Sequence, residues 1–230
     1  TVISKGARTF VIEANSGGGQ AYRMMETSKY SRDKADANGV KLIAYVDGVA
    51  ASAMYGLISS CHEIIANPDA SVGSIGVLIA LSNGMKGKMK EGEVQFVTSG
   101  KGKIPFDETG EFRKEYIENL QARTDDLYEK FTSHVASYRE ITVEKLKEVG
   151  AVVFSSEKSL ELKLIDDIKT NDEFRNYILS IENEGTKQKG KSQMSVIDNA
   201  IKMKELEDVV QAKELALSQA GAEFEAQRHV

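Results

Sequence analysis

The stretch that decides the fold lies at residues 46–77 and reads VDGVAASAMYGLISSCHEIIANPDASVGSIGV. An apolar, strand-like run from Lys41 to Val46 leads into it, and a helix-like run begins just after Ser52. A serine at such a junction exposes its hydroxyl, and the first N–H groups of the helix lack intrahelical acceptors and can face an oxyanion. Ser52 is therefore the candidate nucleophile.

The segments on either side alternate between strand and helix. We predict strands at residues 8–14, 40–46, 63–66, 72–77 and 94–98, and helices at 20–38, 53–60, 78–89, 111–138, 142–149 and 156–164. Strand, helix and strand in succession favour a parallel crossover, which is right-handed almost without exception. The sequence therefore predicts an α/β fold.

The predicted helix at residues 111–138 has the clearest periodicity in the chain. Its apolar residues recur at spacings of four and seven along one face: Phe112, Tyr116, Leu120, Leu127, Phe131 and Val135. Such a face is typical of a core or a subunit interface rather than of a cofactor site.

Composition divides the chain into three parts. We expect a folded domain at residues 1–182 and a polar linker, rich in Lys, Gly and Gln, at 183–195. A helical extension follows at 196–230, with many Ala, Glu, Lys and Leu residues. Its loosely periodic apolar positions cannot bury themselves alone, so this helix should pack on a partner or fray.

The bulk composition excludes several classes of function. Apolar residues make up 41% of the chain, charged residues make up 28%, and the net charge is −5. This balance favours a globular protein that does not bind nucleic acid. Cys61 is the single cysteine, and neither a metal-ligand pattern nor a long apolar run is present. We expect a soluble, cytoplasmic chain without a membrane segment, metal or cofactor.

Ser52 needs a base to become a useful nucleophile. None of the three histidines, His62, His134 and His229, has an obvious route to it. A lysine can serve where desolvation disfavours the ammonium and leaves a neutral amine. Lys101 and Lys103 lie in a polar, glycine-rich loop and are the candidates, although either alone is typical of a surface lysine.

Four motifs carry a resemblance to a known family. They are Asn15-Ser-Gly-Gly-Gly19, Val46-Asp-Gly-Val-Ala-Ala-Ser52, Ala66-Asn-Pro68 through Gly73-Ser-Ile-Gly-Val77, and Ser99-Gly100 to Lys103. In this order they resemble motifs of the signal peptide peptidase A family of serine peptidases. The resemblance spans residues 9 to about 170 and implies a ClpP/crotonase-like fold of repeated β-α-β units, here with a C-terminal helical extension.

The resemblance also implies site residues. Ser52 would be the nucleophile, Lys103 the general base and Ser74 a hydroxyl that orients the lysine amine, with the N–H groups of Gly18 and Ala53 as the oxyanion hole. Lys103 is preferred to Lys101 because it has the family's spacing after Ser-Gly. Gly17 stands where the family usually has proline, and Val77 stands where a ClpP-type enzyme would carry histidine.

Several functions follow from the resemblance as expectations. Family members form rings in which neighbouring subunits or tandem halves supply the serine and the lysine. The tail is similar to that of bacteriophage capsid assembly proteases, which predicts processing of scaffold, capsid or portal proteins in proheads within the host cytoplasm. The alternatives are a peptidase that degrades cleaved signal peptides and a non-catalytic scaffold or assembly protein. A crotonase-type acyl-thioester enzyme would leave Ser52 and Lys103 together unexplained.

Overall fold

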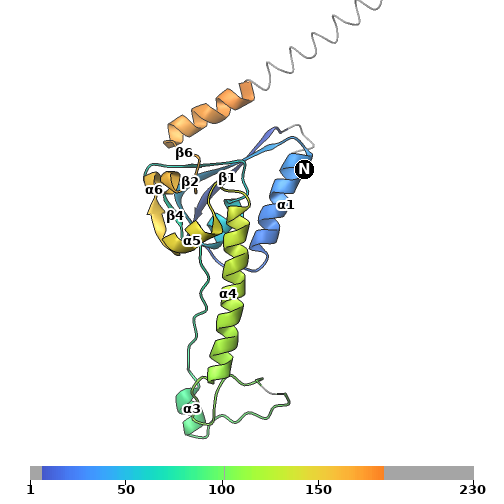
Figure 1. The fold of residues 1–230 in the computed structure, drawn as a ribbon, viewed down its shortest axis with the longest axis vertical. Helices are drawn as coiled ribbons and strands as arrows, with labels where there is room; N and C mark the ends of the chain where they lie inside the picture. Colours follow the sequence, from blue (N-terminus) through green and yellow to red (C-terminus); the bar gives the residue numbers. More distant parts are fainter. Residues whose placement is uncertain (1–6, 101, 184–230) are drawn as a thin grey trace, which may run out of the picture. The chain divides into compact units, whose positions relative to one another are not determined.

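A computed structural model describes residues 7–100 and 102–183. These residues fall into two compact units that divide between Asn176 and Tyr177. The first unit contains these helices and strands, most of which are labelled in Figure 1: β1 Thr9–Ser16, α1 Met24–Ala37, β2 Lys41–Ala51, α2 Ala53–Ile58, β3 Glu63–Ala66, β4 Ser71–Gly73, α3 Lys86–Lys90, α4 Lys114–Ala136, α5 Val143–Val149, β5 Val153–Ser155, α6 Ser156–Glu161 and β6 Asp167–Ile168. Residues 171–183 are also helical.

Strand β2 is the centre of the sheet. It pairs in parallel with β1, β3 and β4, while β6 extends the sheet beyond β3 and β5 extends it beyond β4. The first half of β2 pairs with β3 and its second half with β4, so the sheet curls around this long strand. Helix α1 connects β1 to β2 and α2 connects β2 to β3, which confirms the α/β class.

The curl has a local cause at Gly48. The pairing of β1 with β2 shifts its register between Ala14 and Ser16, so Asn15 is left opposite the bend. Its side-chain oxygen accepts a hydrogen bond from the N–H of Val49 at 3.2 Å, and a Cβ at Gly48 would lie 2.7 Å from that oxygen. The irregularity therefore requires glycine at 48 and redirects the end of β2.

The core lies between the sheet and its helices. Residues 42–46 of β2 are all buried, as expected for a central strand of a parallel sheet with both faces covered. Helices α1, α2 and the last turns of α4 meet at Gly56, where a Cβ would contact Met24 and lie 2.7 Å from a ring carbon of Phe131. Close packing thus holds the helix that follows Ser52.

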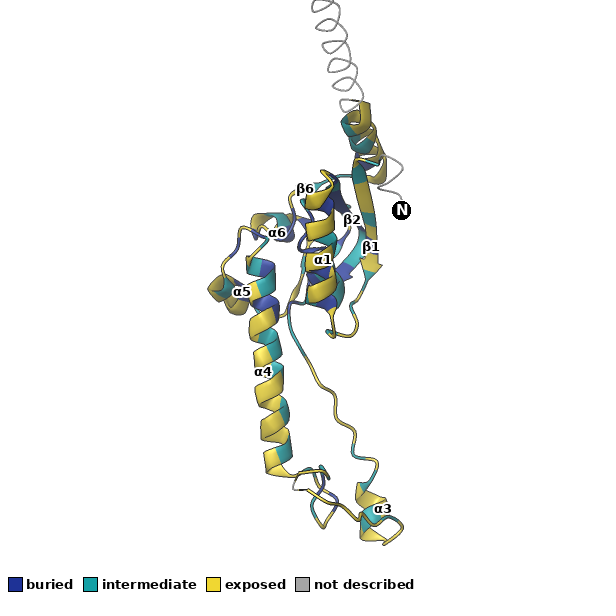
Figure 2. Ribbon diagram, turned by 90° about the vertical axis from the view of Figure 1, so that its right-hand side faces the viewer, coloured by how far each residue is buried: buried dark blue, intermediate teal, exposed yellow. Residues whose placement is uncertain are grey.

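Helix α4 is buried only near its C-terminal end. Phe131, Thr132 and Val135 are its buried residues, although the sequence predicts a longer apolar core face. The preceding turns project beyond the sheet and are largely exposed (Figures 1 and 2). We call residues 76–113 the distal arm; it runs from the sheet to the far end of α4 and contains α3 (Figure 1).

Two secondary-structure predictions are wrong in the distal arm. Residues 78–89 were expected to be helical, but only Lys86–Lys90 forms a helix, and residues 94–98 form no strand. Gly84 and Gly87 lower the helix propensity of the first segment. The second segment has no neighbouring strand to pair with, and the Val97 side chain is fully exposed. The strand predicted at 72–77 ends at Gly73.

Two further predictions concern residues that the structure does not describe. Most of the linker expected at 183–195 and the whole of the helical extension expected at 196–230 lie outside the described residues. Both therefore stay predictions.

Candidate active site

Ser52 occupies a strained position between β2 and α2. Its backbone angles, φ 53° and ψ −125°, are unusual for a residue other than glycine. Its N–H donates to the carbonyl of Gly73 at 2.9 Å, and its own carbonyl accepts from Gly56 at 2.9 Å. Neighbouring strand and helix together hold the conformation. The sequence-based placement of Ser52 at a strand-to-helix turn is confirmed.

The glycine loop lies directly against Ser52. A Cβ at Gly18 would be 2.7 Å from the Cβ of Ser52 and 3.2 Å from its Oγ. Gly18 also has φ +115°, a conformation that other residues rarely adopt. Both the space and the backbone angle therefore require glycine at this position.

The two predicted oxyanion donors differ in their surroundings. The N–H of Gly18 donates to the hydroxyl of Ser16 at 3.2 Å, so it is occupied within its own loop. Ala53 is the first residue of α2, where an N–H has no intrahelical acceptor. An oxyanion could use the Gly18 donor only by sharing it with Ser16 or displacing that contact.

Ser74 lies near Ser52 because β4 pairs with the end of β2. Its φ is 51°, and its N–H donates to the carbonyl of Val152 at 2.8 Å. Ser52 and Ser74 both line a cleft of about 940 Å³, and Gly17 and Gly19 line it as well. The structure thus brings two predicted site residues and the glycine loop to one cavity.

Lys103 is placed elsewhere. It is exposed in the distal arm and is not among the residues that line the Ser52 cleft. Lys101 lies outside the described residues. Of the described residues that do line the cleft, Arg123 is the only charged one. A single copy of the described chain therefore brings the serines together without the lysine.

A second, smaller cavity lies across the glycine loop. It has a volume of about 300 Å³ and is lined in part by Gly18, Ala53, Met54 and Leu57. Gly19, Gln20 and Tyr22 line both cavities. An extended ligand passing over the loop could occupy both sides of the Ser52 turn.

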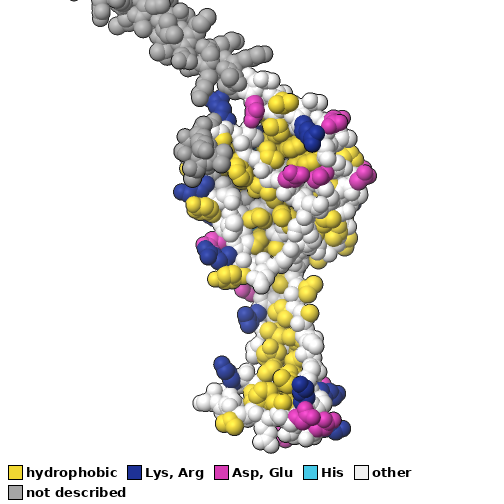
Figure 3. Space-filling view, turned by 180° about the vertical axis from the view of Figure 1, so that it is seen from behind, with side chains coloured by type: hydrophobic (Ala, Val, Ile, Leu, Met, Phe, Trp, Pro, Cys, Tyr) yellow, Lys and Arg dark blue, Asp and Glu magenta, His cyan; other side chains and the backbone are white. Residues whose placement is uncertain are grey.

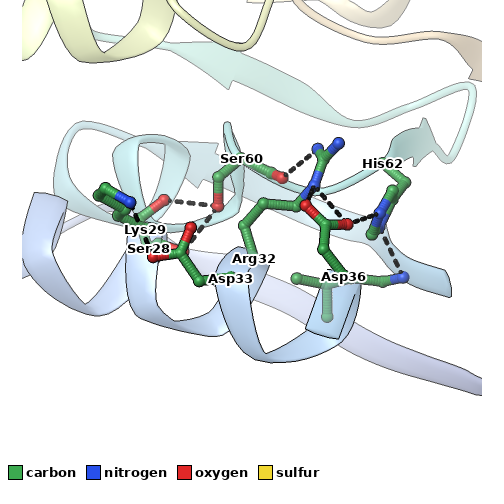
Figure 4. Close-up of polar contacts among 8 residues, drawn as sticks. Ser28, Lys29, Arg32, Asp33, Asp36, Ser60 and His62 are labelled. Atoms are coloured by element: carbon green, nitrogen blue, oxygen red, sulfur yellow. Dashed lines mark hydrogen bonds and ion pairs between the residues drawn. The ribbon is translucent and has the colours of Figure 1, made fainter. Parts of the chain in front are cut away.

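Neither described histidine lines these cavities. His62 accepts the N–H of Leu42 at Nδ1, and its Nε2 lies 2.7 Å from a carboxylate oxygen of Asp36 (Figure 4). Because Nδ1 is an acceptor, Nε2 carries the proton and donates to Asp36. His134 contacts the Ser28 hydroxyl at 3.1 Å, and burial lowers its pKa. These imidazoles hold α1 and α4 against the body, and His229 lies outside the described residues.

Part of the cleft wall was not predicted from the sequence. Arg123, Thr124 and Leu127 of α4 line the cleft, as do Tyr22, Leu78 and Ile79. The available signal was Arg123 and Thr124, which interrupt the apolar face between Leu120 and Leu127. That face was assigned to a core or an interface because periodicity does not show which turns extend beyond a domain.

Two other kinds of site are not found. Within residues 7–100 and 102–183, no three Asp, Glu, His or Cys side chains group closely enough to hold a metal ion. Across the same residues, every helix is too short or too polar to cross a bilayer.

A comparison with known families identifies the family of this chain. Residues 34–181 match the model of peptidase family S49, and they cover Ser52, Ser74 and Lys103. This chain belongs to peptidase family S49. The matched range includes the Ser52 turn and Ser74, whereas the glycine loop that also lines the cleft lies before it.

Three named relatives of this S49 chain have low sequence identity to it. A protein of Synechocystis sp., whose name marks it as a candidate protease, is 28% identical over 79% of this chain and 65% of its own length. The probable protease SohB of Haemophilus influenzae is 27% identical over 74% and 48%, respectively. Capsid assembly protease C of Escherichia phage lambda is 27% identical over 49% and 26%. The S49 chain thus spans less than two thirds of each of these relatives.

Proposed function

We propose that this chain is a serine endopeptidase that uses a Ser52–Lys103 dyad. The observation that carries the proposal is the strained Ser52 turn, packed against Gly18 and sharing a cleft with Ser74, in a member of family S49. A hydroxyl fixed in this way can approach the carbonyl carbon of a bound peptide without first being reoriented.

In the proposed mechanism, the neutral amine of Lys103 removes the proton from Ser52 Oγ. The oxygen attacks the peptide carbonyl, and the N–H groups of Gly18 and Ala53 stabilise the oxyanion. The ammonium of Lys103 returns the proton to the leaving amine. Water, deprotonated by the same amine, then attacks the acyl-enzyme, the bond between the acyl carbon and Ser52 Oγ breaks, and the ammonium of Lys103 returns the proton to Oγ. Ser74 would hold the amine in position.

We further propose that a neighbouring copy of the chain supplies Lys103. The lysine lies in the distal arm, outside the cleft of its own chain. Figure 3 shows hydrophobic side chains gathered along this projecting region. The large hydrophobic residues of the distal arm that are exposed include Leu78, Ile79, Leu81, Phe96 and Val97. Exposed apolar surface of this kind is typical of a subunit contact. A ring of copies would place each arm at the next cleft and desolvate the lysine there.

The substrates proposed for this peptidase are scaffold, capsid or portal proteins in a phage prohead. Two observations support this: the resemblance of the tail to scaffold-type extensions, and a relative named Capsid assembly protease C. The alternative is degradation of cleaved signal peptides, which the resemblance to the signal peptide peptidase A family favours. Cleavage of the chain itself and of a panel of unfolded proteins would be measured. Cleavage at few sites would indicate a narrow specificity, and cleavage of most of the panel would indicate a broad one.

Mixing two inactive variants tests both the dyad and its assembly. Ser52→Ala and Lys103→Ala should each abolish cleavage of an unstructured protein substrate, followed by mass spectrometry. If neighbouring copies form the site, unfolding and refolding the two variants together should restore part of the activity. Lys101→Ala is the matched control and should remain active. Cleavage by Ser52→Ala at the wild-type rate would show that Ser52 is not the nucleophile, and absence of cleavage by the wild type would favour the non-catalytic scaffold or assembly protein.

A further inference from the structure

Arg123 is the one charged side chain among the described residues that line the Ser52 cleft. It is exposed on α4 and makes no hydrogen bond or ion pair within the described part of the chain. Its acidic neighbours are engaged with other partners. Asp125 accepts a hydrogen bond from Gln121 at 2.7 Å, and Asp126 pairs with Lys130 at 2.6 Å.

The placement of Arg123 follows from the helix period. Leu127 follows Arg123 by four residues and Thr124 by three, so its side chain neighbours both on the helix surface, and all three residues line the cleft. The neighbouring hydroxyl of Thr124 donates to the carbonyl of Leu120 at 2.8 Å. The guanidinium is therefore the group on this face that is left to bind a ligand.

The rest of the cleft wall is neutral. It combines apolar side chains such as Tyr22, Leu78 and Ile79 with the hydroxyls of Ser52 and Ser74. A ligand in the cleft would displace water from this wall and weaken the screening around Arg123. A guanidinium presents paired N–H donors that match a carboxylate, and such charge-assisted contacts are stronger than neutral hydrogen bonds.

The net charge of the chain is opposite in sign to the charge of Arg123. At −5, the protein as a whole disfavours acidic ligands, so a preference for one must arise locally. We propose that Arg123 is a specificity-determining residue that binds a carboxylate of the substrate peptide in the Ser52 cleft. The inference rests on the proposed function, because the bound peptide is the one that Ser52 would attack. An Asp or Glu side chain is one source of the carboxylate, and the peptide's own C-terminus is the other.

Binding to the Ser52→Ala protein tests the inference without requiring catalysis. The probes are fluorescently labelled peptides that share one neutral sequence and have amidated C-termini. Each peptide carries a single Glu, Gln or Lys, and the position of this residue differs from one peptide to the next. At one or two positions Glu should bind about fivefold to tenfold more tightly than Gln, as a coupling of about 1 kcal/mol predicts. A neutral peptide with a free C-terminus forms a separate arm and tests the second source.

Variants at position 123 should change this preference and little else. In the Ser52→Ala protein, the additional substitution Arg123→Gln should remove the tighter binding of the Glu peptide. The substitution Arg123→Glu should instead make the peptide with Lys at the same position bind most tightly. The matched control is Lys114→Gln, which removes a positive charge from the same helix outside the cleft. It should leave the preference unchanged. The inference would be overturned if Glu and Gln peptides bound equally at every position and the neutral peptide bound equally with a free and with an amidated C-terminus. An advantage that persists in Arg123→Gln would also overturn it.

Two further readouts separate the inference from its premise. If wild-type protein cleaves none of the peptides but the Glu advantage depends on Arg123, the proposed peptidase function fails and the carboxylate site stands. If cleavage depends on Ser52 but shows no such advantage in kcat/KM, the peptidase stands and the inference fails. Sedimentation of Arg123→Gln must also match the wild type. Loss of assembly would assign Arg123 to a subunit contact and overturn the proposal.

Discussion

The curled sheet around Ser52 and the distal arm, residues 76–113, are built by different means. In the sheet, the side chains of residues 42–46 are buried and three parallel partners surround one strand. The arm instead has a small aromatic group, in which the ring centroids of Phe106 and Phe112 lie 4.9 Å apart, and a few polar contacts. One of these joins the Asn83 side chain to the carbonyl of Gly110 at 2.7 Å.

This difference shows where the proposed dyad would be divided. Ser52, Ser74 and the glycine loop belong to the rigid sheet, whereas Lys103 belongs to the arm. A nucleophile on a strained turn needs a packed scaffold to maintain its conformation. A base in a region with little packing of its own would depend on a second copy of the chain for its position.

Truncating one phenylalanine in each region should give the largest difference. Phe131→Ala removes a ring that is 2% exposed between α4 and the body, and should cost about 3–5 kcal/mol of unfolding free energy. Phe112→Ala, in the arm, should cost less than about 1 kcal/mol because its ring is only partly buried. Urea denaturation followed by circular dichroism measures both. Equal losses would show that the arm and the sheet unfold as one packed unit.

Breaking an ion pair should also cost more unfolding free energy in the sheet region than in the distal arm, but the difference should be smaller than for the phenylalanines. The Asp166 carboxylate accepts hydrogen bonds from both terminal nitrogens of Arg139, at 3.1 and 2.8 Å. The Arg139 side chain is only 5% exposed. Asp166→Asn should therefore cost about 3 kcal/mol, because it leaves a buried guanidinium without its counter-ion.

The matched substitution in the arm is Glu111→Gln, which breaks the exposed pair with Lys86. It should cost less than about 1 kcal/mol. Unfolding free energies of the two variants at the same pH and salt concentration make the comparison. A loss at Glu111 as large as that at Asp166 would contradict the view that the arm depends little on specific polar contacts.

The smallest effect should come from the pH dependence of the sheet region. Burial lowers the pKa of His134 in the folded state, so the unfolded chain binds the proton more readily. The stability due to neutral His134 is complete above the unfolded value of about 6.5 and is lost as pH falls toward the lower folded pKa. His134→Gln should flatten the unfolding free energy against pH in this window. An unchanged slope would assign it to other groups.

Much of the sheet could be predicted from the sequence because its strands are short, apolar and bounded by turn residues. The strand at 63–66 and the helix ending before Asn38 match the predictions closely. The arm could not be predicted, since residues 94–98 have strand-like composition but no partner strand. Likewise, the periodic face of α4 could not show that only its last turns are buried.

The sequence by itself determined that Ser52 follows a strand and precedes a helix, and that Gly18 lies in a glycine-rich turn. Local composition and turn chemistry are sufficient for such statements. Only the tertiary structure decided that Gly18 packs on Ser52, that Ser74 and Arg123 share its cleft, and that Lys103 does not. These relations depend on strand pairing and on how far α4 extends, which are set by contacts between residues far apart in the chain.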